Sequence, residues 1–184
     1  MKICLIRHGK PIAAINPKLS ASGFATWVRH YNQSNIASYS LPPPEFKQSF
    51  TSSFIVTSDL PRAIDSAYVC LNKQPDLILK EVREMEIPRY KLPFTLHAYT
   101  WLIFNRILWF LGFSGRVESF KCAKTRARNI ARELHQLAIK HNNVVVFGHG
   151  LMNRYIAKEL HKLGGDHKRK GKGYWSMIEL TFDR

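Results

Sequence analysis

The feature of this sequence that most constrains its fold is the alternation of short apolar runs with longer segments of helical periodicity. Lys2–Arg7, Phe54–Thr57 and residues 143–147 have the branched apolar composition of β-strands, and the last of these is apolar enough to be buried on both faces. A helix is predicted from Ser20, a good capping residue, to about Gln33. Strands that alternate with helices predict an α/β fold: a three-layer sandwich in which helices cover both faces of a mostly parallel central sheet.

The other predicted elements extend this pattern. Further strands are predicted at residues 77–83 and 175–182, and the Pro-rich stretch 38–49 is expected to be a loop. Ser58 or Asp59 is expected to cap the helix that follows the second strand. The remaining helices are predicted at residues 94–112, 119–141 and 151–163.

Length and charge bound the class of protein. The 184 residues are those of one ordinary domain, and 45% of them are hydrophobic, so the chain can bury a sizeable core. The 28 Lys and Arg residues against 13 Asp and Glu give a formal charge of +15. This excess favours anionic partners such as phosphorylated metabolites, nucleic acid or a membrane surface, or it simply keeps the protein in solution.

Cysteine usage and hydropathy favour a cytoplasmic location. The three cysteines, Cys4, Cys70 and Cys122, are odd in number and have no CxxC spacing, which argues against a disulfide framework and against a thiolate metal site. No apolar run reaches the length of a transmembrane helix, and the first apolar run meets a charge at Arg7, too early for the core of a signal peptide.

Residues suited to anion chemistry stand directly after four of the predicted strands. They are Arg7, His8 and Gly9; Ser58 and Arg62; Glu84; and His149 and Gly150. In an open α/β sheet, ligands bind outside the carboxyl ends of the strands, so these residues are expected to share one rim. Two guanidinium groups can clamp a tetrahedral anion, an imidazole can attack phosphorus, and a carboxylic acid can protonate a leaving alkoxide.

Five segments, in order along the chain, carry a family resemblance. They are LIRHGK, KLSASG, TSDLPRAIDSA, VVVFGHG and YWSMIEL. In these segments the chain resembles the histidine phosphatase superfamily, also called the phosphoglycerate mutase-like family. The resemblance spans nearly the whole chain and implies one histidine phosphatase domain over residues 1–184. Only about residues 87–117 have no matching family segment. The family often inserts cap elements at this point, and a cap insertion is therefore expected there.

The resemblance also implies a role for each strand-end residue. His8 matches the family's phosphate-accepting nucleophile, Glu84 its proton donor, and His149 a second catalytic histidine. The residues expected to bind phosphate are Arg7, Gly9, Ser58, Arg62, His149 and Gly150, with the two glycines letting the backbone approach the ligand. No cofactor and no metal are expected, since the other six histidines lack the spacing of metal ligands.

Two stretches differ from the family pattern. Pro11 and Ala14 stand where many members have Ser and Asn, and Asn16 is a candidate to supply the missing amide from a shifted loop. The residues after the glutamate are MEIPRYKLP in place of the family's glycine. Glu86, two residues after Glu84, is thus a second candidate for the acid, because residues two apart in a strand share a face.

The strand-end residues, together with the resemblance, predict a metal-independent phosphomonoesterase that works through a phosphohistidine on His8, with Glu84 as proton donor. The expected substrate is a phosphorylated small molecule or a phosphoprotein. A phosphatase is favoured over a mutase, because the mutase subgroup carries longer insertions than this chain has. The alternative is a catalytically diverged module that keeps the phosphate pocket and binds an anionic partner, either RNA or a membrane surface.

Two further segments leave their roles open. The apolar helix at residues 94–112 is expected to lid the pocket, to extend the core as a buried helix, or to form a dimer or an interfacial contact. The basic stretch 161–173 is expected to be a solvated loop or to guide anionic substrates. No specific nucleic acid is expected as a partner, and any binding to anionic surfaces is expected to be weak and salt-sensitive.

Overall fold

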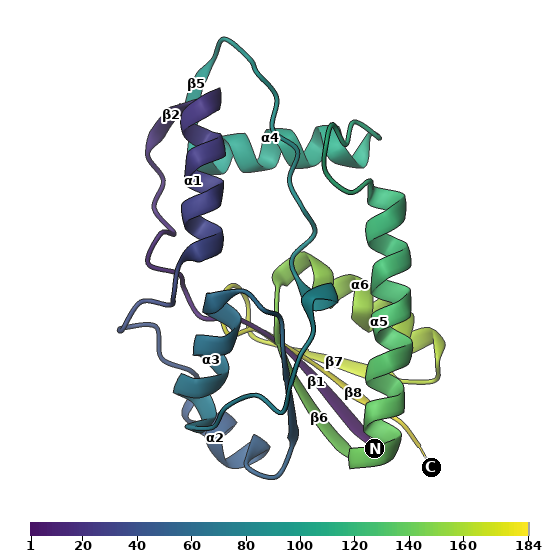
Figure 1. Cartoon of the computed structure of the whole chain (residues 1–184). Coiled ribbons are helices and arrows are strands. Elements are labelled where there is room, and N and C mark those ends of the chain that lie inside the picture. The colour runs from purple at the N-terminus through teal and green to yellow at the C-terminus, as the bar shows by residue number, and fades with distance from the viewer. Residues whose placement is uncertain (184) are drawn as a thin grey trace.

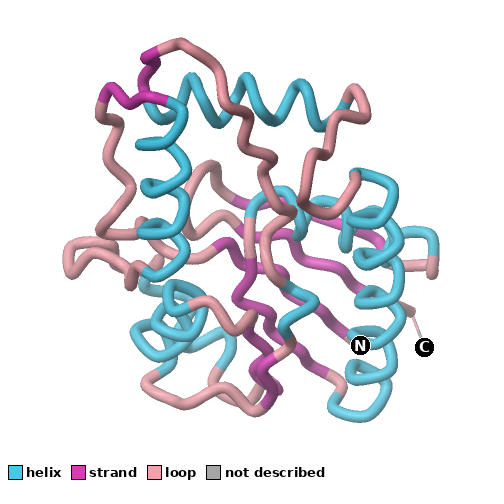
Figure 2. Tube along the Cα trace, turned by 45° about the horizontal axis from the view of Figure 1, so that its top comes forward, coloured by secondary structure: helices cyan, strands magenta, loops and turns pink. Residues whose placement is uncertain are grey.

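The computed structural model describes residues 1–183, and within them a six-stranded sheet forms the centre of the molecule (Figures 1 and 2). Across the sheet the order is β4 (Leu77–Ile78), β3 (Phe54–Thr57), β6 (Asn143–Gly148), β1 (Lys2–Arg7), β8 (Met177–Thr181) and β7 (Asp166–Lys170). The first four of these strands are parallel to one another, and β8 is antiparallel to both of its neighbours. The fold is the predicted α/β fold with a mostly parallel central sheet.

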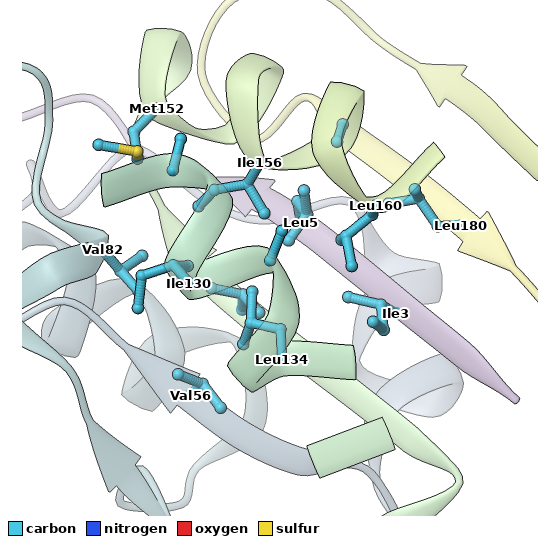
Figure 3. Close-up of a cluster of buried hydrophobic side chains, with 14 of the residues drawn as sticks. Ile3, Leu5, Val56, Val82, Ile130, Leu134, Met152, Ile156, Leu160 and Leu180 are labelled. Carbon is cyan, nitrogen blue, oxygen red and sulfur yellow. The ribbon is translucent and has the colours of Figure 1, made fainter. Parts of the chain in front are cut away.

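Helices cover both faces of this sheet, because its central strands are apolar on both sides. One face carries α5 (Phe120–His141) and α6 (Gly150–Lys162), and the other carries α2 (Pro44–Phe50) and α3 (Pro61–Leu71). Along β1, Ile3 and Leu5 point to α5 and α6, where Figure 3 shows them beside Leu134 and Ile156. The alternate residues of β1 join the core under α2 and α3.

A smaller unit lies at one end of the molecule, at the top of Figure 1. It consists of β2 (Lys18–Ser20), α1 (Ala21–Gln33), β5 (Thr95–His97) and α4 (Ala98–Phe110), and β2 pairs with β5. Phe24, Trp27, Ala98 and Trp101 form a core of its own, separate from the two cores against the main sheet. We refer to these four elements as the α4 unit. Within residues 1–183, no helix has both the length and the apolar composition needed to cross a membrane.

Two predictions about helix starts were wrong. The stretch 38–49, expected to be a loop, contains most of α2, because Pro44 occupies the first helical turn, where its missing N–H costs nothing. Neither Ser58 nor Asp59 is the N-cap of α3; that position belongs to Leu60, which makes no side-chain capping bond. The polar side chains of both residues have partners elsewhere.

The strand predictions were wrong at places where a strand is defined by its backbone hydrogen bonds to a neighbouring strand and its side chains show no apolar pattern. The strand predicted at residues 77–83 ends at Ile78, and the short 3₁₀ helix η1 (Lys80–Val82) follows it. The basic stretch 161–173, expected to be a loop, contains β7, whose five side chains are all exposed. The helix predicted from residue 94 begins only at Ala98, because β5 first pairs with β2.

Candidate active site

The carboxyl ends of three parallel strands bring the predicted residues together. In the register of the sheet, the ends of β1 and β3 both lie beside the end of β6. His8, Ser58 and His149 follow these three strands and therefore meet at one edge, with the two imidazole ring centroids 5.1 Å apart. Arg62 reaches the same place from the first turn of α3. We call these four residues the histidine cluster; all four are buried.

Hydrogen bonds hold His8 in one tautomer. Its Nδ1–H donates to the carbonyl oxygen of Gly9 at 2.7 Å, and its Nε2 accepts from Nε of Arg62 at 3.2 Å. Burial, and to a smaller degree the Arg62 charge, lowers the pKa of His8 well below its ordinary value. His8 is therefore neutral near pH 7, with its Nε2 lone pair free of a proton.

Arg62 is an oriented donor in the floor of the site. It is 2% exposed, and one of its terminal nitrogens donates to the carbonyl oxygen of Tyr31 at 3.1 Å and to Oδ1 of Asn32 at 3.4 Å. The guanidinium also lies 4.9 Å from the centroid of the Tyr31 ring. These contacts with α1 fix the direction in which Arg62 presents its N–H groups to an anion.

Ser58 supports the second histidine rather than a helix. Its Oγ lies 2.7 Å from Nε2 of His149, while Nδ1 of His149 has no hydrogen-bond partner among residues 1–183. Burial, and next the charge of Arg62, lowers the pKa of His149 well below its ordinary value. The His149 ring is therefore a neutral group, with one buried nitrogen available to a ligand.

Arg7 and the two glycines that were predicted to bind phosphate, Gly9 and Gly150, are tightly packed. The Arg7 guanidinium carbon lies 4.5 Å from the centroid of the Tyr174 ring, and its Nε is buried without a partner in the described chain. A Cβ on Gly150 would come within 3.3 Å of that Nε, and a Cβ on Gly9 would come within 2.7 Å of the Trp175 ring. The space that these glycines leave is thus taken by Arg7 and Trp175.

Glu84 lies at the N-terminus of α6. One of its carboxylate oxygens accepts from the backbone N–H of Leu151 at 3.1 Å, and the other accepts from Met152 at 2.9 Å and from Met85 at 3.0 Å. Unpaired N–H groups at a helix start favour a negative charge, so this position suits a carboxylate. The same side chain lines a pocket together with Arg7 and Arg62.

The two alternative site residues are engaged elsewhere. Oε2 of Glu86 accepts from the backbone N–H of Glu118 at 3.3 Å, although Glu86 also lines the pocket. Glu84 and Glu86 do not share a strand face, because they lie in a loop after η1. Oδ1 of Asn16 accepts from the backbone N–H of Tyr99 at 2.9 Å and so caps α4. The side-chain oxygen of Asn16 is therefore engaged at the start of α4.

The pocket is bounded by the sheet edge on one side and by the α4 unit on the other. Its volume is about 210 Å³, and it presents Arg7, Arg62 and Glu84 opposite Trp27 and Leu102. We call it the strand-end pocket. His8 lies behind Arg62 in this arrangement, joined to it by the bond from Nε to Nε2. The pocket thus combines two arginines and a carboxylate with an apolar wall.

Sequence reasoning missed several residues of the site. Tyr31 and Asn32 bind Arg62 from the last turn of α1, and Tyr174 lies under Arg7. Ser66, one turn after Arg62 on α3, accepts from the backbone N–H of Gly9 at 2.9 Å. Tyr174 opens the YWSMIEL segment and Ser66 lies within TSDLPRAIDSA, so both had a nearby signal; Tyr31 and Asn32 reach the site through tertiary packing.

Comparison with known proteins shows the family of this chain. The family model described as the histidine phosphatase superfamily (branch 1) matches residues 44–184, which is more than half of the chain. The chain belongs to this superfamily. No curated protein matches the sequence significantly.

Solved structures show the same fold at low sequence identity. A mutant phosphoserine phosphatase from Entamoeba histolytica, in complex with phosphoserine, has a TM-score of 0.61 and 16% identity, over 99% of this chain and 91% of that chain. A phosphoglycerate mutase from Bacillus anthracis has a TM-score of 0.60 and 16% identity, over 100% and 91%. The ecdysone phosphate phosphatase from Bombix mori, in complex with tungstate, has a TM-score of 0.56 and 12% identity, over 97% of this chain and 88% of that chain. Family membership supports an enzyme of the phosphatase or mutase type.

Proposed function

We propose that this protein is a metal-independent phosphomonoesterase that forms a phosphohistidine on His8. The observation that carries the proposal is the state of His8: a neutral, buried imidazole whose unprotonated Nε2 is directed at the Arg62 guanidinium. A phosphate group bound by Arg62 would stand beside that lone pair. A nucleophile held in the correct tautomer next to the group that binds its target is what covalent catalysis needs.

The bonds of the proposed reaction follow from the positions of five side chains. Arg62 turns its Nε–H from His8 to a phosphate oxygen, and Arg7 and His149 bind the others. The Nε2 lone pair of His8 then attacks phosphorus, the bond from phosphorus to the ester oxygen breaks, and that oxygen takes a proton from Glu84. Water next attacks the phosphohistidine and gives a proton to Glu84, which releases phosphate and restores neutral His8.

Charge in the pocket supports the absence of a metal from this scheme. Two arginines, Arg7 and Arg62, line the pocket and would neutralise the charge of a bound phosphate. Among residues 1–183, no three His, Cys, Asp or Glu side chains are grouped closely enough to hold a metal ion.

We propose that residues 87–117 act as a cap on a single domain, since Ile87, Leu102 and Arg106 line the pocket opposite the strand ends.

A second candidate function is a phosphate-binding module without turnover. The observation that favours it is the position of Glu84, whose two oxygens both accept from backbone N–H groups. Glu84 has to give up at least one of these bonds before it can carry a proton to a leaving group. If it never does, the pocket binds a phosphorylated partner and releases it unchanged.

Trapping the intermediate separates the two functions. Brief incubation with a ³²P-labelled phosphomonoester, followed by rapid quenching, should leave an acid-labile, alkali-stable label on the wild-type protein. Turnover of a panel of phosphomonoesters should be the same with and without a chelator. His8→Ala should abolish both label and turnover while its circular dichroism spectrum stays that of the wild type.

Three results would contradict the phosphatase assignment. They are turnover that a chelator removes and one metal restores, a label that persists in His8→Ala, and tight phosphate binding with neither label nor turnover. The last of these would establish the binding module instead.

A further inference from the structure

The side of α4 opposite its buried residues Trp101 and Trp109 carries an exposed apolar stripe. Exposed fractions are 63% for Ile103, 53% for Ile107 and 42% for Phe110, and Leu111 and Phe113 are exposed directly after the helix. The first three lie four and three residues apart, which places them on one face of α4. We call these five residues the outer α4 stripe. Figure 1 shows α4 along the outer edge of the molecule, at the far end from the main sheet.

The stripe contributes to neither the core nor the pocket. The opposite side of α4 buries Trp101 and Trp109, and Leu102 and Arg106 line the strand-end pocket. Within residues 1–183, no segment covers the stripe. A contiguous apolar surface of this kind on a folded protein marks an interaction site more often than single exposed residues do.

Positive charge flanks the stripe. Residues 87–124 contain six Lys and Arg and one acidic residue, Glu118, which is paired with Arg126. Arg106 donates to backbone carbonyls at the pocket, and the other five are exposed: Arg89, Lys91, Arg116, Lys121 and Lys124.

Two contacts place these charges beside the stripe. The Tyr90 hydroxyl donates to the carbonyl oxygen of Phe113, so Arg89 and Lys91 lie next to the end of the stripe. The Phe120 ring packs on Phe110 with centroids 5.0 Å apart, which brings the adjacent start of α5, with its lysines, to the same end. The exposed charges around the stripe are therefore mostly positive, with Glu86, which binds the backbone N–H of Glu118, as an exposed acid beside them.

We propose that the outer α4 stripe and its basic flank dock the protein on an anionic lipid bilayer. Apolar side chains on one face of a helix insert at the boundary between headgroups and acyl chains, and flanking Lys and Arg bind anionic headgroups. A second copy of the chain is a poorer partner, because pairing two stripes would bring two basic flanks together. Nucleic acid would use the charges but leave the apolar side chains in water.

Vesicle sedimentation tests this surface. The probe is large unilamellar vesicles of phosphatidylcholine with one quarter phosphatidylglycerol, and pure phosphatidylcholine vesicles are the reference. Wild type should sediment with the anionic vesicles and not with the reference. Ile103→Glu combined with Ile107→Glu should weaken binding at least about tenfold, and so should Arg89→Glu combined with Lys91→Glu.

Matched controls carry the same changes elsewhere on the surface. Ile139→Glu alters an exposed isoleucine of α5, and Lys168→Glu with Lys172→Glu alters exposed lysines in and beside β7. Both should bind the anionic vesicles within about threefold of wild type, because the charge of a distant face is screened beyond about 10 Å. All positions are exposed, and circular dichroism checks that each variant is folded.

Four results would overturn the proposal. The first is wild-type protein that does not bind anionic vesicles. The second is a stripe variant that binds them as tightly as wild type. A concentration-dependent dimer that the stripe variant abolishes, without vesicle binding, would assign the surface to a second copy. RNA binding that is insensitive to Ile103→Glu and stronger than vesicle binding would assign the charges to nucleic acid. None of these results depends on phosphatase turnover.

Discussion

The histidine cluster, through Arg62, and the α4 unit meet at the same pocket but are held in place in different ways. The cluster is a buried polar network, in which His8 accepts from Arg62 and His149 contacts Ser58, on the ends of strands that belong to the main sheet. The α4 unit is an apolar assembly with its own core around Phe24, and it meets the main domain through Trp109, which packs in the core of the main sheet, and through hydrogen bonds made by Arg106 and Arg62.

The difference indicates that the histidine cluster and the α4 unit have separate roles in the site. Because the polar groups of the cluster, apart from Nδ1 of His149, have fixed partners, replacing one of them unpairs another inside the protein. A change at a pocket-lining residue of α4 such as Leu102 should alter mainly the shape of the pocket wall. The chemistry should therefore be sensitive to the cluster, and the choice of leaving group should depend on α4. The predictions below test this division, from the largest expected effect to the smallest.

The largest effect is expected at Arg62. Arg62→Ala removes the donor to a bound phosphate and the hydrogen bond that orients His8, so kcat/KM should fall by about 10²–10³. Arg62→Lys should restore little, because a lysine cannot reach His8 and the carbonyl oxygen of Tyr31 at once. Steady-state kinetics on one ester measures both variants. A loss of less than about threefold in Arg62→Ala would show that the cluster does not bind the reacting phosphate.

Glu84 should affect the leaving group rather than binding. Glu84→Gln should slow turnover of an alkyl phosphate about 10²-fold, since an alkoxide needs a proton to leave, but should slow phosphoryl transfer from a nitrophenyl ester far less. Hydrolysis of the phosphoenzyme should also slow, so the nitrophenyl ester should give a burst followed by slow turnover. Glu86→Gln is the matched control and should show neither effect. If Glu86→Gln alone shows the leaving-group dependence, the acid has been assigned to the wrong residue.

Residues close to the strands were predictable from the sequence, and residues fixed by distant packing were not. An apolar strand followed by a polar residue places that residue at the sheet edge, and so His8, Arg62 and His149 were predicted to meet. Ser58 was first expected to cap a helix, because a local pattern cannot reveal a histidine that lies 91 residues away in the chain. Asn16 likewise had no local signal for its place at the start of α4.

The elements that the sequence did not predict have weak local signals. β7 has five exposed side chains and no apolar alternation, so only its pairing with β8 makes it a strand. β4 is two residues long, and η1 begins where a longer strand was expected. In each case the backbone partner, rather than the side chains, decides the conformation.

The buried histidines should make stability depend on pH. Burial lowers the pKa of both His8 and His149 in the folded protein, whereas in the unfolded chain each titrates near the ordinary value of about 6.5. Below that pH the unfolded state binds more protons, so the free energy of unfolding should fall as pH falls, by at most about 1.4 kcal/mol per pH unit for each histidine. Urea titrations from pH 7.5 to 5 measure the slope.

One variant sharpens this measurement. His8→Gln should remove about half of the slope, because one of the two buried histidines is then absent. A slope that His8→Gln does not alter would mean that His8 takes up a proton in the folded protein as readily as in the unfolded chain. It would then not be the neutral group on which the proposed attack depends.

The smallest effect is expected on α4, at Leu102. This side chain lines the pocket, while its neighbour Ile103 points outward, so the two residues form a matched pair on one helix. Leu102→Ala removes apolar contact area worth about 1 kcal/mol when the side chain is partly buried, which corresponds to about fivefold in KM. That rise should appear for an ester with an aromatic leaving group and should be absent for a small polar one, with kcat unchanged in both. Ile103→Ala should alter neither constant. If Leu102→Ala instead lowers kcat for both esters, α4 helps to position the reacting groups, and the separation between the histidine cluster and the α4 unit is wrong.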